Sequence, residues 1–354
     1  MHFGGANHLP DPELIDVRGI DETMSLESGA VDIIDESAEA GGKSQRSFSV
    51  RVPASTSNLG AGFDSFSLAL QLYLTVSARV VPEASAICCV TSSGEGSTSG
   101  LLSPTEDNLI FRAMSFAARR EGWTLPPVRL DVYNELLLGR GLGSSAAAIV
   151  AGLTLSSLIC DQELSPQTVL RYALEMEGHA DNVAAAYYGG WVVSCVKPDG
   201  NVLAVKRLWP EDLKVIVISP DALLNTAETR NALPDTVERA DAVHNLQRVA
   251  LFSAALESGG YDLLWDAMQD RMHQPYRQSL VPGLAEALAT KPQPGLVGVA
   301  LSGSGPSVIA LACDRLPEIG EGIANSFRSH GMPATVRIIE VDREGCKATV
   351  SKSG

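Results

Sequence analysis

The sequence of 354 residues contains no uninterrupted run of about 18 apolar residues, which a membrane-spanning helix would require. The N-terminus lacks the basic and apolar segments of a secretory signal peptide, so we expect a cytoplasmic protein without a membrane partner. An excess of basic residues is also absent. The formal net charge is −15 at pH 7, which argues against a nucleic-acid partner.

Patterns of disulfide and metal binding are missing as well. The six cysteines form no C-x-x-C pair, and the six histidines show no spacing typical of a zinc site. Most of the cysteines lie in apolar runs such as Ile87–Val90, which predicts buried, reduced thiols. Internal repeats, the mark of a solenoid, are not present.

The length is compatible with about two domains of ~150 residues, and 45% apolar residues are typical of a globular protein. Residues 1–45 hold ten acidic and two basic residues, a net charge of 2 − 10 = −8, and few apolar ones. We predict that they form a flexible acidic extension. The remaining chain is predicted to form two domains, residues 46–210 and 211–354.

Strand-like and helix-like segments alternate from Ser47 onward, which favours an α+β fold with layers of sheet and helix. The predicted strands are Ser47–Val52, Leu74–Val81, Val128–Asn134, Trp191–Val196, Leu213–Ser219, Leu296–Leu301, Ser307–Cys313 and Thr335–Val341. The predicted helices are Asn108–Glu121, Ser144–Cys160, Pro166–Glu177, Asp241–Glu257, Tyr261–Met272 and Pro317–Ser329. A hairpin turn is expected at Asp199–Asn201.

The most informative segment is Leu137–Ala148, in which three alternating glycines precede two serines and an alanine-rich helical stretch. Glycine allows the backbone to turn sharply and to approach a ligand closely. A helix that begins at Ser144 would direct its free N–H groups and the positive end of its dipole at the same place. The segment therefore suits phosphate binding, although a glycine-rich loop alone can also be a plain tight turn.

Two further segments narrow the interpretation: Val52–Asp64 (VPASTSNLGAGFD) and Gly298–Ser307 (GVALSGSGPS). With the glycine loop they resemble, in order and spacing, the three signature motifs of the GHMP kinases. Glu177–Val183, Asn225–Arg230 and His273–Gly283 are most similar to the homoserine kinases within that family. The resemblance extends from about Ser47 to the C-terminus. It implies a two-domain GHMP kinase fold, with a ribosomal protein S5 domain 2-like N-terminal domain and a ferredoxin-like C-terminal domain.

The resemblance implies ATP-dependent phosphorylation of L-homoserine to O-phospho-L-homoserine in threonine biosynthesis, and a homodimer is a family expectation. The implied ATP-binding residues are Asn108, Leu137, Leu138, Gly139, Arg140, Gly141, Leu142, Gly143, Ser144, Ser145, Ala146 and Ala147. For Asn108, the cap of the following helix is an equally good interpretation. The Ser302–Pro306 turn is expected to lie beside the phosphate loop, first of all as supporting structure.

Mg²⁺ is the implied metal, held in the family by one loop serine and one carboxylate. We assign Ser145 as the hydroxyl, with Ser144 as the second choice, because a cation that keeps several waters needs few protein ligands. Glu177 and Glu175 are both candidates for the carboxylate. They are two positions apart on a predicted helix and cannot face one site together, and we choose Glu177.

For the acceptor, the resemblance places Asp64 at the ammonium group, with Asn58 beside it, and Arg230 and Arg277 at the carboxylate. The fork of an arginine can bind a carboxylate through two hydrogen bonds. The remaining implied residues are His179 at the carboxylate and Asn182 and Thr226 at the hydroxyl.

No general base is obvious. Asp181 is the acid nearest to Asn182, and the identity of the base stays open. A different GHMP small-molecule kinase and a non-catalytic nucleotide-binding module are the alternative interpretations. The first would not need a partner for an ammonium group, and the second would predict a broken phosphate loop.

Overall fold

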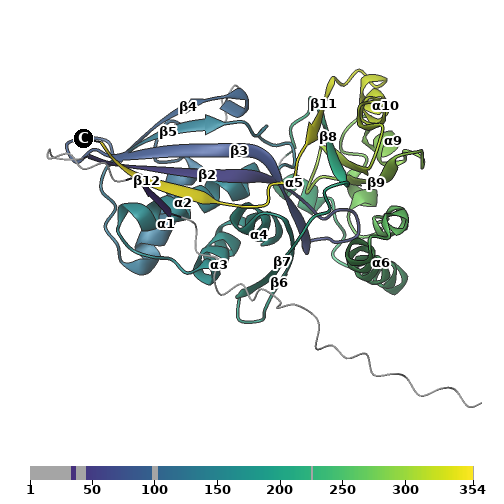
Figure 1. Ribbon diagram of the computed structural model, residues 1–354, viewed down its shortest axis with the longest axis horizontal. Helices are drawn as coiled ribbons and strands as arrows, with labels where there is room; N and C mark the ends of the chain where they lie inside the picture. The colour runs from purple at the N-terminus through teal and green to yellow at the C-terminus, as the bar shows by residue number, and fades with distance from the viewer. Residues whose placement is uncertain (1–32, 37–44, 98–102, 225, 354) are drawn as a thin grey trace, which may run out of the picture.

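The computed structural model describes residues 33–36, 45–97, 103–224 and 226–353 (Figure 1). The predicted acidic extension, residues 1–45, lies outside the described residues except for Ile33–Glu36 and Gln45. Ile33–Glu36 form strand β1, which pairs in parallel with the last strand, β12 (Lys347–Ser353). Within the described part of the chain, no helix combines the length and the apolar character needed to cross a membrane.

An eight-stranded sheet organises the first half of the molecule (Figure 1). Besides β1 and β12 it contains β2 (Gln45–Ser57), β3 (Phe66–Val80), β4 (Cys88–Ser93), β5 (Val128–Asn134), β6 (Trp191–Val196) and β7 (Val202–Arg207). The main order is β1-β12-β2-β3-β5-β4, while β6 pairs with β3 and with β7. The β1–β12 and β4–β5 pairs are parallel, and the other pairs are antiparallel.

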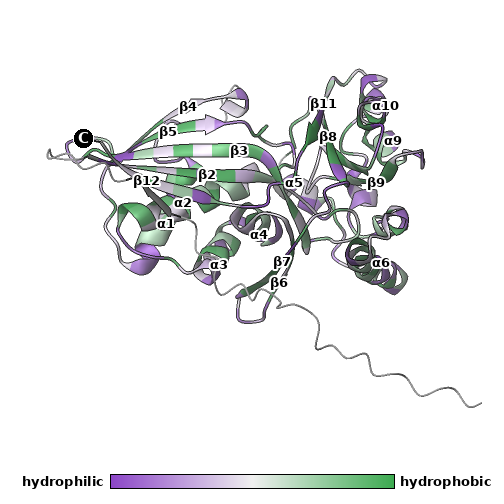
Figure 2. Ribbon diagram, viewed as in Figure 1, coloured by the Kyte–Doolittle hydropathy of each residue, from purple (hydrophilic) through white to green (hydrophobic). Residues whose placement is uncertain are grey.

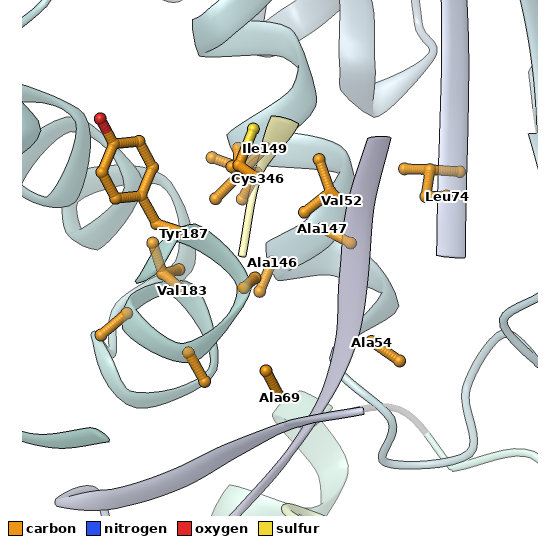
Figure 3. Close-up of a cluster of buried hydrophobic side chains, with 14 of the residues drawn as sticks. Val52, Ala54, Ala69, Leu74, Ala146, Ala147, Ile149, Val183, Tyr187 and Cys346 are labelled. Atoms are coloured by element: carbon orange, nitrogen blue, oxygen red, sulfur yellow. The ribbon is translucent and has the colours of Figure 1, made fainter. Parts of the chain in front are cut away.

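Four helices cover one face of this sheet: α1 (Leu109–Glu121), α2 (Ser144–Ile159), α3 (Pro166–Glu177) and α4 (Asp181–Tyr188) (Figure 1). Helix α2 is apolar on almost all sides because it is enclosed between the sheet and its neighbouring helices. Figure 3 shows Ala146 and Ala147 of α2 close to Val52 of β2, with Val183 of α4 nearby. In Figure 2 hydrophobic residues follow α2 and parts of β2 and β3.

A four-stranded antiparallel sheet organises the second half, in the order β11-β8-β10-β9. Its strands are β8 (Lys214–Pro220), β9 (Leu296–Leu301), β10 (Val308–Ala312) and β11 (Ala334–Ile339). Its helices are α5 (Thr226–Asn231), α6 (Arg239–Ser258), α7 (Leu264–Ala267), α8 (Gln274–Arg277), α9 (Leu284–Leu288) and α10 (Leu316–Arg328).

The predicted continuous helix Tyr261–Met272 is wrong. A 3-10 turn (Tyr261–Leu263) leads into the short α7, which ends at Ala267. The Asp270 carboxylate accepts hydrogen bonds from the backbone N–H groups of Met272, His273 and Gln274. A side chain that satisfies the backbone in this way competes with helical hydrogen bonds.

One hydrophobic core extends across both halves, and a second core lies within the second half alone. Phe252 of α6 packs against Phe66 of β3 and Trp191 of β6, with ring centroids 5.1 and 5.7 Å apart. The last strand, β12, returns to the sheet of the first half, and the predicted division 211–354 did not foresee this.

The prediction of buried thiols holds only for Cys88 and Cys346, whereas Cys89, Cys195 and Cys313 are exposed and Cys160 is half-buried. Successive side chains of a strand point to opposite faces, so an apolar run does not bury each of its members.

Candidate active site

A pocket opens between the two halves and encloses about 640 Å³ of empty space, part of it open to solvent. It brings together residues of all the sequence motifs. The predicted site residues in its lining are Asn58, Asp64, Gly139, Gly141, Leu142, Gly143, Ser144, Ser145, Glu177, His179, Asp181, Asn182, Arg230 and Arg277. Ser57, Phe63, Leu224, Gly303 and Ser304 also line it and were not predicted, although four of them lie inside the quoted motifs.

The glycine loop needs its glycines for space as well as for backbone freedom. Gly139, Gly141 and Gly143 have φ angles of +67°, +74° and +66°. A Cβ atom on Gly141 would lie 2.2 Å from the Ser302 carbonyl oxygen, and one on Gly143 would lie 2.2 Å from Ser55 Oγ. Only glycine fits both the conformation and the space at these positions.

The start of α2 is directed at the pocket. Gly143 precedes the helix and offers no side-chain cap, and the N–H of Ala147 is the first to bond back to the Gly143 carbonyl. The N–H groups of the first turn therefore have no partner within the helix, and the positive end of the helix dipole lies beside them. This is an anion-binding arrangement.

The third motif packs against this loop, as predicted. Ser302 Oγ donates a hydrogen bond of 2.6 Å to the Gly141 carbonyl. The backbone N–H of Gly303 donates to the Ser57 carbonyl at 3.1 Å, and that of Ser307 donates to the Arg140 carbonyl at 3.3 Å. The turn therefore joins the phosphate loop to the first motif.

Ser145 and Glu177 lie in direct contact in the lining of the pocket. Ser145 Oγ donates to Glu177 Oε2 at 2.6 Å, whereas Glu175 turns away and pairs with Arg120 at 3.0 Å. The Ser144 hydroxyl donates to the Leu137 carbonyl. In the described parts of the chain, no group of three or more His, Cys, Asp or Glu side chains could hold a metal. A hydroxyl beside a carboxylate still suits Mg²⁺, which prefers oxygen ligands and keeps several waters.

The opposite end of the pocket holds charges of both signs. Arg230 donates two hydrogen bonds to the Asp64 carboxylate, at 2.8 and 3.2 Å. Asn58 fixes the loop around Asp64, because its Oδ1 accepts from the Asp64 N–H at 3.0 Å and its Nδ2 donates to the Gly303 carbonyl at 2.9 Å.

The second cation, Arg277, is buried, with 2% of its surface exposed. Burial, together with the charge of Arg230, lowers the pKa of Arg277 to about 10. The guanidinium carbons of Arg230 and Arg277 lie 5.8 and 5.5 Å from the centre of the Phe63 ring. Two cations therefore converge on one end of the pocket.

His179 and Asp181 form a buried pair, with His179 Nδ1 2.9 Å from Asp181 Oδ1. Burial disfavours the charged form of both side chains, but their hydrogen bond and their opposite charges have the larger combined effect. The hydrogen bond and charge of Asp181, with the charge of Glu177, raise the pKa of His179. Hydrogen bonds from His179 and the Asn182 backbone hold the pKa of Asp181 below its ordinary value. A carboxylate with a lowered pKa is a weak base.

The Asn182 side chain is fixed by two serines of the first motif. Its Nδ2 donates to Ser57 Oγ at 2.9 Å, and its Oδ1 accepts from Ser55 Oγ at 2.9 Å. Asn182 is therefore held in one orientation in the lining of the pocket.

Some predicted site residues do not line the pocket: Asn108, Leu137, Leu138, Arg140, Ala146, Ala147 and Thr226. The Arg140 guanidinium turns to Asp221, at 2.7 Å. The Asn108 side chain caps α1, because its Oδ1 accepts from the Ile110 N–H and its Nδ2 donates to the Ser103 carbonyl. Ala146 and Ala147 are buried in the core (Figure 3). Thr226 begins α5, but its side chain lies outside what the structure describes.

Comparisons with known proteins agree with this architecture. Residues 108–190 match the GHMP kinase N-terminal domain model and residues 250–329 match the C-terminal one. A homoserine kinase of Solibacter usitatus is 39% identical over 85% of this chain and 97% of its own. One from Deinococcus radiodurans is 44% identical over 75% of this chain and 84% of its own. The crystal structure of a Cytophaga hutchinsonii homoserine kinase has a TM-score of 0.75 at 27% identity, covering 88% and 99% of the two chains.

The two-domain fold, with an anion-binding loop at the junction of its halves, defines a GHMP kinase. Within that class, the chain belongs to the homoserine kinase family. The family and the fold class predicted from the sequence motifs are thereby confirmed.

Proposed function

We propose that the protein transfers the γ-phosphoryl group of ATP to the side-chain hydroxyl of L-homoserine, giving O-phospho-L-homoserine and ADP for threonine synthesis. One observation carries the proposal: a single pocket places an anion-binding helix start at one end and an acid with two arginines at the other. Homoserine is a zwitterion with a hydroxyl group, and a site that binds it needs an acidic side chain for its ammonium group and basic side chains for its carboxylate.

At the phosphate end, the N–H groups at the start of α2 bind the triphosphate. Ser145 and Glu177 would hold Mg²⁺, since their oxygen atoms already lie 2.6 Å apart. When bound, Mg²⁺ neutralises phosphate charge. The glycine loop holds the donor in line with the acceptor and excludes water, which is most of what phosphoryl transfer requires.

At the acceptor end, Asp64 receives the ammonium group, and Arg230 and Arg277 receive the carboxylate. His179, whose raised pKa favours its cationic form, adds positive charge on the same side. Asn182 orients the hydroxyl. Asp181 holds His179 and is too acidic to act as a strong base, and we therefore ascribe catalysis to proximity and charge.

Kinetics with altered acceptors test this proposal. Arg230→Ala and Arg277→Ala should each raise the KM for homoserine at least tens of fold, because an unpaired buried carboxylate costs roughly 2–5 kcal/mol. The KM for ATP should stay close to that of the wild type. Arg328→Ala is the matched control, since Arg328 lies outside the pocket lining and makes exposed contacts with Glu321, Asn325 and the Ala334 carbonyl. A surface ion pair of this kind is worth about 0–1 kcal/mol.

Asp64→Asn should narrow the preference for homoserine over 4-hydroxybutyrate, which lacks the amino group. A wild-type enzyme that phosphorylates both compounds equally well would refute the amino-acid acceptor. An ADP-release screen against homoserine, mevalonate, shikimate and galactose would then identify another acceptor. A cytoplasmic location and a homodimer stay predictions.

A further inference from the structure

His273 lies one residue before α8 and does not line the pocket. Its imidazole is completely buried. Nδ1 lies 3.2 Å from Arg277 Nη1, and Nε2 lies 2.8 Å from the Gly60 carbonyl oxygen. The ring also stacks on Phe63, with centroids 5.1 Å apart and 19° between the planes. His273 therefore connects the first motif with the second arginine of the acceptor site.

These neighbours define the protonation state of His273. A guanidinium only donates hydrogen bonds and a carbonyl only accepts them, so Nδ1 must carry a lone pair and Nε2 a hydrogen. The imidazole is neutral. Burial, with the charge of Arg277, lowers the pKa of His273 against the opposing charges of Asp270 and Asp64. A proton on Nδ1 would place two donors face to face beside Arg277.

The backbone around His273 is anchored independently of the pocket. The Asp270 carboxylate accepts from the N–H groups of Met272, His273 and Gln274. Asn245 of α6 donates to the same carboxylate at 2.7 Å and to the Ala61 carbonyl at 3.1 Å. The backbone that carries the imidazole is therefore held in place by the second half, while the ring itself contacts the loop of the first motif.

Arg277 depends on this support. Its Nε donates to the Thr229 carbonyl at 3.2 Å, and its Nη1 faces His273 Nδ1 and, at 3.4 Å, the Gly303 carbonyl. Arg230 lies on the same Phe63 ring, so like charges oppose the placement of Arg277. The lone pair on His273 Nδ1 accepts a hydrogen bond from Arg277 and so offsets this repulsion.

We propose that His273 is a positioning residue for acceptor recognition, and that its unprotonated Nδ1 fixes the Arg277 guanidinium so that the remaining Nη2 edge binds the acceptor carboxylate. The inference rests on the proposed function, because Arg277 is taken to meet the carboxylate of homoserine. His273 itself touches neither substrate.

Two substitutions distinguish the role of the Nδ1 atom of His273 from that of its Nε2 atom. The Oδ1 atom of His273→Asn can accept at the place of Nδ1, while His273→Gln can donate at the place of Nε2 but offers no acceptor at Nδ1. His273→Gln should raise the KM for homoserine about tenfold or more, the loss expected for a hydrogen bond to a charged group. His273→Asn should stay within a few fold of the wild type. The kcat and the KM for ATP should hardly change in either.

The acceptor analogue 3-amino-1-propanol provides a second readout, since it has the amino group and the hydroxyl but no carboxylate. Its KM should be the same in the wild type and in His273→Gln, and His273→Gln should add nothing to the loss in Arg277→Ala. Equal defects of the Asn and Gln variants, or a defect with 3-amino-1-propanol, would show that His273 serves folding only.

Nitrogen NMR of the unaltered protein keeps the inference testable if a variant does not fold. The His273 imidazole should be neutral with its hydrogen on Nε2, and a cation or the Nδ1–H form at neutral pH would overturn the inference. The proposed function would fail separately, if the wild type did not phosphorylate homoserine.

Discussion

Asp64 and Arg230 are held in place by one another in the structure. Each side chain is about a third exposed, and the two form a bidentate pair. Such a pair contributes only about 0–1 kcal/mol. It orients both groups, yet a ligand that supplies an ammonium and a carboxylate can replace it at little cost. A ligand with only one of these charges would leave Asp64 or Arg230 without a partner.

A pair of glutamate variants tests the phosphate end of the site. Glu177→Gln should lower kcat by ~10²–10³-fold, because Glu177 faces Ser145 and, in the proposed function, holds Mg²⁺ against the phosphate charge. The KM for homoserine should change far less. Glu175→Gln is the matched control on the same helix, since Glu175 pairs with Arg120 outside the pocket. Steady-state kinetics that showed the reverse order would exchange the roles of the two glutamates.

The His179–Asp181 pair predicts a pH-dependent stability. Because the pKa of folded His179 is raised, its contribution to the free energy of unfolding is complete below its ordinary pKa of about 6.5. It is lost as the pH rises through the raised value. The lowered pKa of Asp181 means that its own contribution persists until strongly acidic pH. Urea unfolding of the wild type and His179→Gln should therefore diverge most near pH 5 and converge at alkaline pH. A gap that widened with pH would contradict this.

At the scale of helices and strands, local signals predicted some elements and tertiary contacts decided others. Helix α3 begins and ends as predicted, because Ser165 caps it, Pro166 is its first residue, and Gly178 ends it in the left-handed conformation. The contact between Asn245 and Ala61 joins residues 184 positions apart, and no local sequence pattern could predict it.

The motifs predicted most of the pocket, but they could not show how it is supported. His273 lies next to Arg277 because it comes four residues earlier, directly before α8, and the turn that Asp270 stabilises leads into that helix. The predicted helix Tyr261–Met272 ended before both residues. The Asn108 side chain makes the contacts of a helix cap, and its predicted role in ATP binding stays a prediction.

Two glycine variants test the junction of the loop and α2. Gly143→Ala should lower kcat strongly, because the new methyl group would collide with Ser55 Oγ and displace the start of the helix. Gly122→Ala is the matched control: its φ angle is +72°, yet nothing lies within 4 Å of the added Cβ. It should cost about 1 kcal/mol of stability and leave kcat unchanged. Similar kinetics of the two variants would mean that the crowding at Gly143 has no functional role.

In the molecule as a whole, the pocket lies where the two halves meet, and a shared core that includes Phe252 joins them. Strand β1, the described part of the segment before β2, pairs with β12 at the edge of the sheet and does not line the pocket.

Deletion of the acidic extension tests whether the fold and the pocket depend on it. A variant that begins at Ser44 should fold and keep its kcat and both KM values, because the acidic segment has too few apolar residues to support a core. A second variant that begins at residue 32 keeps β1 and shows what that strand adds to thermal stability. Loss of turnover in the first variant but not in the second would make β1 necessary.

The position of β12 has a consequence for biosynthesis. In the sheet β12 lies between β1 and β2, although the whole of the second half separates it from them in the sequence. While the ribosome is still making the second half, β2 has an uncovered edge, and such an edge pairs readily with other chains. The first half thus cannot complete its sheet when it emerges. The sheet is finished only once β12 has been synthesised, after the whole of the second half.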